Sequence, residues 1–235
     1  MEVDIDELLI NIELRQMSRY LGMVKRSLSN ELQKLDETYR LEIEQDVETF
    51  EEADEVEHHY QDQFAELETS FPTMIFGSFV VAWYSFVEQK LLDICERREL
   101  RLSISAKENG NFGKGIWRAK KIFDANGYKI SNNHWQELVK INRLRNFIVH
   151  TGYNVPPKQD VEFDLVNDSN LWERDISDYS ISEDLAVYLK NHSMITAVHF
   201  LRYITPTIEY CEHLVDFGED FFENLFLCLN NGNSS

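Results

Sequence analysis

One segment near the middle of the chain, Asn132–Tyr153, has apolar and polar residues at helical spacing. On a helical wheel of about 100° per residue with Leu138 at zero, its apolar side chains gather within about 80° of that line. They are Trp135, Ile141, Ile148 and Val149. Asn132 or Asn133 can cap the start of the helix, and Gly152 can close its end in the left-handed conformation. The segment therefore predicts one helix with a buried face.

Arg145 falls near the middle of this apolar face, at roughly −20° on the same wheel. Arginine is rarely buried without a partner, because removing an unpaired charge from water is costly. Arg143 and His150 lie together at roughly 120–140°, on the polar side. The position of Arg145 therefore requires a partner. That partner is either a carboxylate of the chain itself, for which Glu88 is the candidate, or a ligand shared with a second subunit.

The other segments also show helical spacing. Apolar residues recur from Ile5 to about Arg40, which predicts one long helix or two in a bundle. Glu42–Glu68 is strongly acidic and predicts a second helix with a solvated face. Met74–Glu99 is the most apolar segment and is expected to be the central helix. Helical spacing returns over Leu185–Leu214, where Pro206 can interrupt the helix, and an aromatic helix is expected over Phe217–Leu229.

These patterns predict an all-α fold, a helical bundle. Four prolines and nine glycines in 235 residues are too few for a β-sandwich built from many tight turns. Residues 161–166 and 179–182 alternate apolar and polar side chains, which predicts a small hairpin or extended insertion. We expect a single domain over 1–235, divided into acidic N-terminal helices (1–70), core helices (71–153), the insertion (154–182) and C-terminal helices (183–230).

Thr69–Val87 holds no charged residue over 19 positions, and about 20 apolar residues can span a bilayer. Pro72, Gly77 and several serines interrupt it, and its apolar pattern continues among charged residues. We therefore expect a buried helix and no membrane contact. The acidic N-terminus lacks the order of a secretory signal, and three widely spaced cysteines are typical of reduced thiols. A cytoplasmic protein is expected.

The net charge of −19 is unevenly distributed. Residues 101–150 carry ten basic and three acidic side chains, whereas residues 1–71 carry six basic and twenty acidic ones. The local field, rather than the net charge, decides where a polyanion docks. We expect the basic block to contribute to substrate binding, together with the first charge that interrupts the apolar central helix. The residues concerned are Arg118, Lys121, Lys140, Arg143 and Glu88.

Several familiar kinds of active site are absent from the sequence. It has no Gly-x-Ser-x-Gly elbow, no His-Glu-x-x-His, no dinucleotide fingerprint and no complete phosphate loop. Glu55 and His59 have the i, i+4 spacing of two metal ligands on one helix face, but the sequence indicates no third ligand. We expect neither a metal nor a cofactor.

The run Arg145-Asn146-Phe147-Ile148-Val149-His150 resembles the signature of the HEPN domain family. In that signature an arginine is followed by a polar residue and, a few positions later, by a histidine. The segment Tyr84–Glu88, followed by Leu91 and Leu92, looks like the helix that precedes the motif in many such domains. The resemblance covers roughly Phe71 to Tyr153, and the later helices loosely.

The resemblance implies a helical homodimer with the motif helix at its interface. It also implies a metal-independent ribonuclease with a composite active site, in a toxin–antitoxin or anti-phage role, and Arg145, Asn146 and His150 as catalytic residues. Arg143 also fits the spacing; Arg145 is preferred because Asn146 follows it and because its position requires a partner. Tyr153 is a candidate for modification by an antitoxin, although it follows the histidine by three positions where modified members have two.

The implied chemistry needs only the chain and RNA, such as tRNA or mRNA. The 2′-hydroxyl of RNA attacks the adjacent phosphate, His150 serves as general acid or base, and Arg145 holds the phosphate. The two side chains point about 140° apart on one helix, so a two-fold pairing is expected to bring them to a shared cleft. The alternative is a non-catalytic helical module that dimerises and binds a nucleotide, nucleic acid or protein partner. In that case Arg145 is ion-paired internally and His150 only favours the helix dipole.

Overall fold

The structure is a computed structural model that describes residues 4–46, 49–100, 114–158, 179–198 and 201–231. The described chain is predominantly helical, as expected for an all-α fold. Its helices are α1 (Ile5–Asp46), α2 (Phe50–Ala65), a π-helical segment (Glu66–Ser70), α3 (Phe71–Arg97), α5 (Ile116–Ala125), α6 (Asn132–Thr151), α7 (Glu183–Asn191) and α8 (Ile208–Asn231). Three short strands are β1 (Asn154–Val155), β2 (Ile195–Val198) and β3 (Leu201–Ile204).

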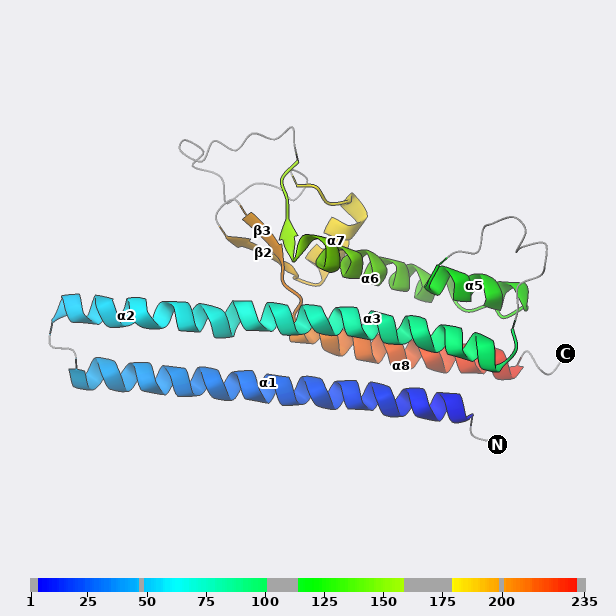
Figure 1. Cartoon of the computed structure of the whole chain (residues 1–235), viewed down its shortest axis with the longest axis horizontal. Coiled ribbons are helices and arrows are strands. Elements are labelled where there is room, and N and C mark those ends of the chain that lie inside the picture. The colour runs from blue at the N-terminus through cyan, green and yellow to red at the C-terminus, as the bar shows by residue number, and fades with distance from the viewer. Residues whose placement is uncertain (1–3, 47–48, 101–113, 159–178, 199–200, 232–235) are drawn as a thin grey trace.

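Two long antiparallel rods form the base of the molecule (Figure 1). The first rod is α1, a single helix of 42 residues where one or two helices were expected. The second is the continuous run of α2, the π-helical segment and α3. Helix α8 packs against both α1 and α3, while α5 and α6 pack against α3 and α7 packs against α6. Helix α3 is therefore the central helix, as predicted.

The buried side chains of α3 explain its central position. Residues Val80, Trp83, Val87, Leu91 and Ile94 are fully buried and recur three or four positions apart, so they form a continuous apolar face. Within the described residues, the run Glu52–Arg97 is one helix that is long and apolar enough to cross a membrane. The central helix of a bundle meets the same criterion of length and composition, and α8, α5 and α6 pack against α3.

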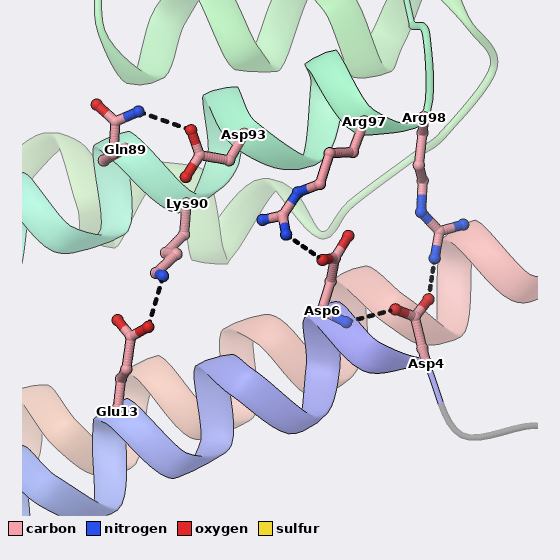
Figure 2. Close-up of polar contacts among 8 residues, drawn as sticks. All are labelled: Asp4, Asp6, Glu13, Gln89, Lys90, Asp93, Arg97 and Arg98. Carbon is pink, nitrogen blue, oxygen red and sulfur yellow. Dashed lines mark hydrogen bonds and ion pairs between the residues drawn. The ribbon is translucent and has the colours of Figure 1, made fainter.

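Polar contacts attach the beginning of α1 to the end of α3 (Figure 2). Glu13 pairs with Lys90 at 2.7 Å and Asp6 pairs with Arg97 at 2.6 Å. Asp4 pairs with Arg98. Each of these pairs is partly solvated and contributes only about 0.2–1 kcal/mol. Part of the N-terminal acidic charge therefore compensates basic residues of α3 and does not simply face solvent.

The segment after α7 differs from the sequence prediction. Helical spacing with an interruption only at Pro206 was expected over Leu185–Leu214. Instead, α7 ends at Asn191, residues 195–198 and 201–204 form the antiparallel pair β2–β3, and α8 begins after Pro206, at Ile208. Ser193, at a φ of 54°, turns the chain out of the helix. The apolar positions 195, 198, 201 and 204 fit helical spacing, yet short runs are ambiguous. β-Branched and aromatic residues in this segment favour strands.

The expected extended insertion is described only at its two ends. Strand β1 pairs with β3, giving the sheet order β1-β3-β2, and Pro157 forms an isolated bridge with Tyr179. The alternating residues 161–166 lie outside the described part of the chain. The small sheet lies beside the C-terminal end of α6 (Figure 1), and its strand β1 follows α6 directly in sequence.

Candidate functional site at the C-terminal end of α6

The termini of α6 are set by local residue chemistry. Gly152 adopts the left-handed conformation at φ 60° and ψ 44°, and its N–H donates to the carbonyl of Ile148 at 3.1 Å. This confirms the predicted glycine end. The expected asparagine cap is wrong, because Ser131 is the N-cap residue and its side chain makes no capping hydrogen bond. Asn132 already lies in the first helical turn.

The buried face of α6 differs from the predicted one at its C-terminal end. Its buried residues are Trp135, Leu138, Ile141, Leu144 and Ile148. Val149, expected to be buried, is 50% exposed. A spacing of mostly three residues is shorter than the helical repeat of about 3.6, so the buried line drifts around the helix along its length. The drift leaves Arg145 half-buried at the edge of the face rather than in its middle.

Arg145 is held without an ion pair among the described residues. Its Nη1 donates to Oδ1 of the neighbouring Asn146 at 2.8 Å, and its Nε is buried with no hydrogen-bond partner. Glu88, the candidate internal partner, instead lies against Gly115, where an added Cβ would overlap its Oε1. Burial raises the pKa of Tyr84 well above its usual range; nearby Glu88 adds to this effect and Arg145 opposes it. The guanidinium therefore lies near Tyr84, with no carboxylate of the described chain bound to it.

His150 lies in the last turn of α6 and its side chain is exposed. The exposed Val149 precedes it, and Asn146 is half-buried one turn earlier. Since residues 145 and 150 point about 140° apart on a helix, one copy of the chain does not bring Arg145 and His150 together. Arg145 is half-buried and His150 is exposed on another side of the helix, so a cleft shared by both groups requires a second copy.

The basic residues expected to bind substrate have separate environments. Arg143 pairs with Asp184 of α7, and Lys140 pairs with Glu137 at 3.1 Å. Arg118, exposed on α5, lines a cavity of about 500 Å³ together with acidic residues of α3. Lys121 is half-buried on the same helix. In the described structure these cations do not converge on the motif.

Tyr153 is anchored to the central helix. It adopts a left-handed φ of 73°, and its ring lies so close to Gly77 that a Cβ there would overlap it. Burial raises the pKa of its phenol, while a hydrogen bond with the Ser78 side chain acts in the opposite direction. The half-buried ring fixes the end of α6 against α3. Modification of Tyr153 stays a prediction.

The structure also brings together a set of residues that sequence reasoning missed. Glu137 of α6, His192 after α7 and His213 of α8 have ligand atoms within 4.8 Å of one another. The candidate metal pair, Glu55 and His59, is instead exposed on α2. No short motif links the three clustered residues, because each comes from a different helix. Only the packing of the three helices reveals them.

Comparisons of the chain with models of protein families, with curated proteins and with solved structures give no match. The chemistry of its own side chains therefore carries the functional argument.

Proposed function

We propose that the chain is a metal-independent endoribonuclease of the HEPN type that acts as a homodimer in a toxin or anti-phage role. Arg145, Asn146 and His150 of two copies would form one composite site. The observation that carries this proposal is that Arg145 has no carboxylate partner among the described residues. Its guanidinium is half-buried, and within the described residues it bonds only the amide oxygen of Asn146. A cation left without a carboxylate at a partly desolvated edge favours binding of a phosphate.

The choice between the two arginines rests on their partners. Arg143 is already engaged by Asp184 across the α6–α7 contact. Arg145 keeps its outer donors for a ligand, while Asn146 fixes one of its nitrogens at 2.8 Å. A planar guanidinium held in this way can bind two phosphate oxygens side by side, and it stabilises the negative charge that develops during attack.

His150 would supply the proton transfers. An imidazole near neutral pKa can accept the proton of the attacking 2′-hydroxyl or give one to the leaving 5′-oxygen. The reaction then forms a 2′,3′-cyclic phosphate and a free 5′-hydroxyl. Val149 and His150 are both exposed, so the second copy would contact one apolar and one polar side chain here. A two-fold axis repeats the same face, so that both motifs can line one cleft.

The proposal is tested by incubating purified protein with total RNA or tRNA in EDTA. We expect cleavage that leaves 2′,3′-cyclic phosphate ends. Arg145→Ala and His150→Ala should each reduce the rate by at least about 100-fold and leave a folded dimer, as loss of a general acid–base or phosphate contact does. Arg143→Ala is the matched control for the arginine, and His59→Ala is the control for the histidine.

Two results would reject the assignment. Full activity in both motif variants would remove Arg145 and His150 from the chemistry. An intact dimer that binds RNA or nucleotide and never cleaves RNA would instead identify a non-catalytic binding module.

A further inference from the structure

A cluster of two histidines and one glutamate lies where α6, α7 and α8 meet. Glu137 extends from α6, His192 follows the last turn of α7, and His213 belongs to α8. Their nearest ligand atoms all lie within 4.8 Å of one another, and each residue is half-buried. The two imidazole rings are 5.2 Å apart between centroids and tilted by 34°. Three good ligands are thus collected from three separate helices.

The ligand types and their separation suit a zinc-like ion. Zinc binds imidazole nitrogen at about 2.0–2.1 Å and carboxylate oxygen at about 2.0–2.2 Å, so tetrahedral ligand atoms lie about 3.4 Å apart. The observed cluster needs to close by no more than about 1.4 Å to reach that spacing. Two histidines and one carboxylate, completed by water, form a common zinc ligand set.

Two tyrosines surround the cluster and hold its members. The hydroxyls of Tyr188 and Tyr210 are 3.0 Å apart, and Tyr188 also hydrogen-bonds Glu137. The His192 ring lies 4.7 Å from the Tyr188 ring and 5.0 Å from the Tyr210 ring, between centroids. A ligating carboxylate that is hydrogen-bonded from outside is oriented before the metal arrives. The tyrosines therefore fix Glu137 and His192 in place.

One basic side chain lies beside the cluster. Lys140 is the one unfavourable neighbour within the described cluster, because it pairs with Glu137 at 3.1 Å. Its side chain is 45% exposed, so it can move into solvent when a cation binds.

We propose that Glu137, His192 and His213 bind a divalent transition metal of the zinc type, with water as a further ligand. The ion fastens α7, a helix of nine residues, between α6 and α8. The site lies about 12 Å along α6 from Arg145, because eight residues separate Glu137 from it at about 1.5 Å each. The site keeps one position for water, and in this proposal the ion takes no part in the RNA chemistry.

The test is a calorimetric titration of the EDTA-treated and dialysed full chain with Zn²⁺. We expect one saturable site per chain and a higher melting temperature with the ion. Cobalt is the spectroscopic probe, since Co²⁺ in a site with nitrogen ligands absorbs in the visible range. Loss of a residue that only hydrogen-bonds a metal ligand weakens metal binding by about 10- to 100-fold. The double variant His192→Ala/His213→Ala removes two ligands, so its affinity for Zn²⁺ should fall by more than this.

Two matched variants make the test specific. The double variant His58→Ala/His59→Ala removes the same number of histidines from the exposed surface of α2 and should keep the site. Lys140→Ala removes the competing cation and should tighten Zn²⁺ binding by about two- to fivefold.

Two outcomes overturn the proposal. One is the absence of saturable Zn²⁺ binding by the folded wild-type chain. The other is equal binding by the wild type and by the variant that lacks His192 and His213. RNA cleavage is assayed in EDTA, so failure of this proposal leaves the ribonuclease proposal untouched, and the converse also holds.

Discussion

The charged residues in the two halves of α6 differ in their partners. In the N-terminal half, His134 pairs with Asp220 at 2.7 Å and Lys140 pairs with Glu137 at 3.1 Å. Arg143 pairs with Asp184. These contacts lead to α7 and α8 or stay within α6. Charge in this half therefore helps to assemble the protein.

The C-terminal half, beyond Arg143, differs within the described chain. Arg145 bonds only the side chain of Asn146, and His150 is exposed. Arg143 and Arg145 lie two positions apart on one helix, yet among the described residues only Arg143 has a carboxylate partner. The difference teaches that the partner of a charged residue, rather than its place in a motif, distinguishes a cation that joins two helices from one left open to a ligand.

The largest effect is expected from exchanging arginine for lysine at the two positions. Arg145→Lys should reduce the RNA cleavage rate by about 100-fold, because lysine cannot hold two phosphate oxygens in one plane. Arg143→Lys keeps its charge beside Asp184 and should change the rate by no more than about twofold. Initial rates on a labelled tRNA measure both. Equal losses would contradict the distinction between the two arginines.

The next effect concerns the attachment of the C-terminal half to α3. Gly77→Ala should lower the free energy of unfolding by about 1–3 kcal/mol, because the new Cβ overlaps the Tyr153 ring. Gly22→Ala is the control, since nothing lies within 4 Å of a Cβ at that position. It should stabilise the chain by about 0.5–1 kcal/mol through helix propensity. Urea denaturation of both variants measures the difference, and an unchanged Gly77→Ala variant would contradict the close contact.

A pH effect is expected from His192, which follows α7 and lies beside Glu137 in the N-terminal half of α6. Burial, His213 and Lys140 hold the pKa of His192 below its ordinary value of 6.5, against the opposing effect of Glu137. A depressed folded-state pKa contributes stability above the unfolded pKa, and this contribution is lost as the pH falls through the folded pKa. Stability should therefore decrease below pH 6.5 in metal-free buffer, and His192→Asn should reduce that decrease. Chemical denaturation between pH 5 and pH 7.5 provides the measurement; parallel curves for the two proteins would disprove the prediction.

The smallest effect is expected for the ion pair between Arg143 and Asp184. Both side chains are about half-exposed, at 47% and 57%. A double-mutant cycle with Arg143→Ala and Asp184→Ala should give a coupling of about 0.2–1 kcal/mol in unfolding experiments. High salt should reduce this coupling. A coupling of zero would mean that the contact with Asp184 does not stabilise the protein, and it would remove the difference between Arg143 and Arg145.

Local chemistry made much of the fold predictable. The unbroken apolar spacing predicted α3 as the central helix, and Gly152 predicted the end of α6. The β2–β3 pair could not be recognised from the sequence, because its apolar positions 195, 198, 201 and 204 recur at helical spacing and the strands are only four residues long. The half-buried edge position of Arg145 depends on the drift of the buried face, which a wheel of constant period does not show.

The candidate site was predictable only in part. The residues Arg145, Asn146 and His150 could be selected from one short motif because they lie on one helix. The pairing of Arg143 with Asp184 depends on how α7 packs against α6, so it could not be predicted from the spacing of residues in the sequence. Glu137, His192 and His213 are similarly far apart in the chain, so only the arrangement of α6, α7 and α8 brings them together.

The most direct test is the RNA cleavage rate of a heterodimer that combines one Arg145→Ala subunit with one His150→Ala subunit. Different affinity tags allow this mixed dimer to be purified. Each homodimer should be inactive, whereas the heterodimer retains one arginine and one histidine on opposite subunits and should recover a large part of the wild-type rate. A heterodimer as inactive as both homodimers, although folded and dimeric, would contradict a site shared between two subunits.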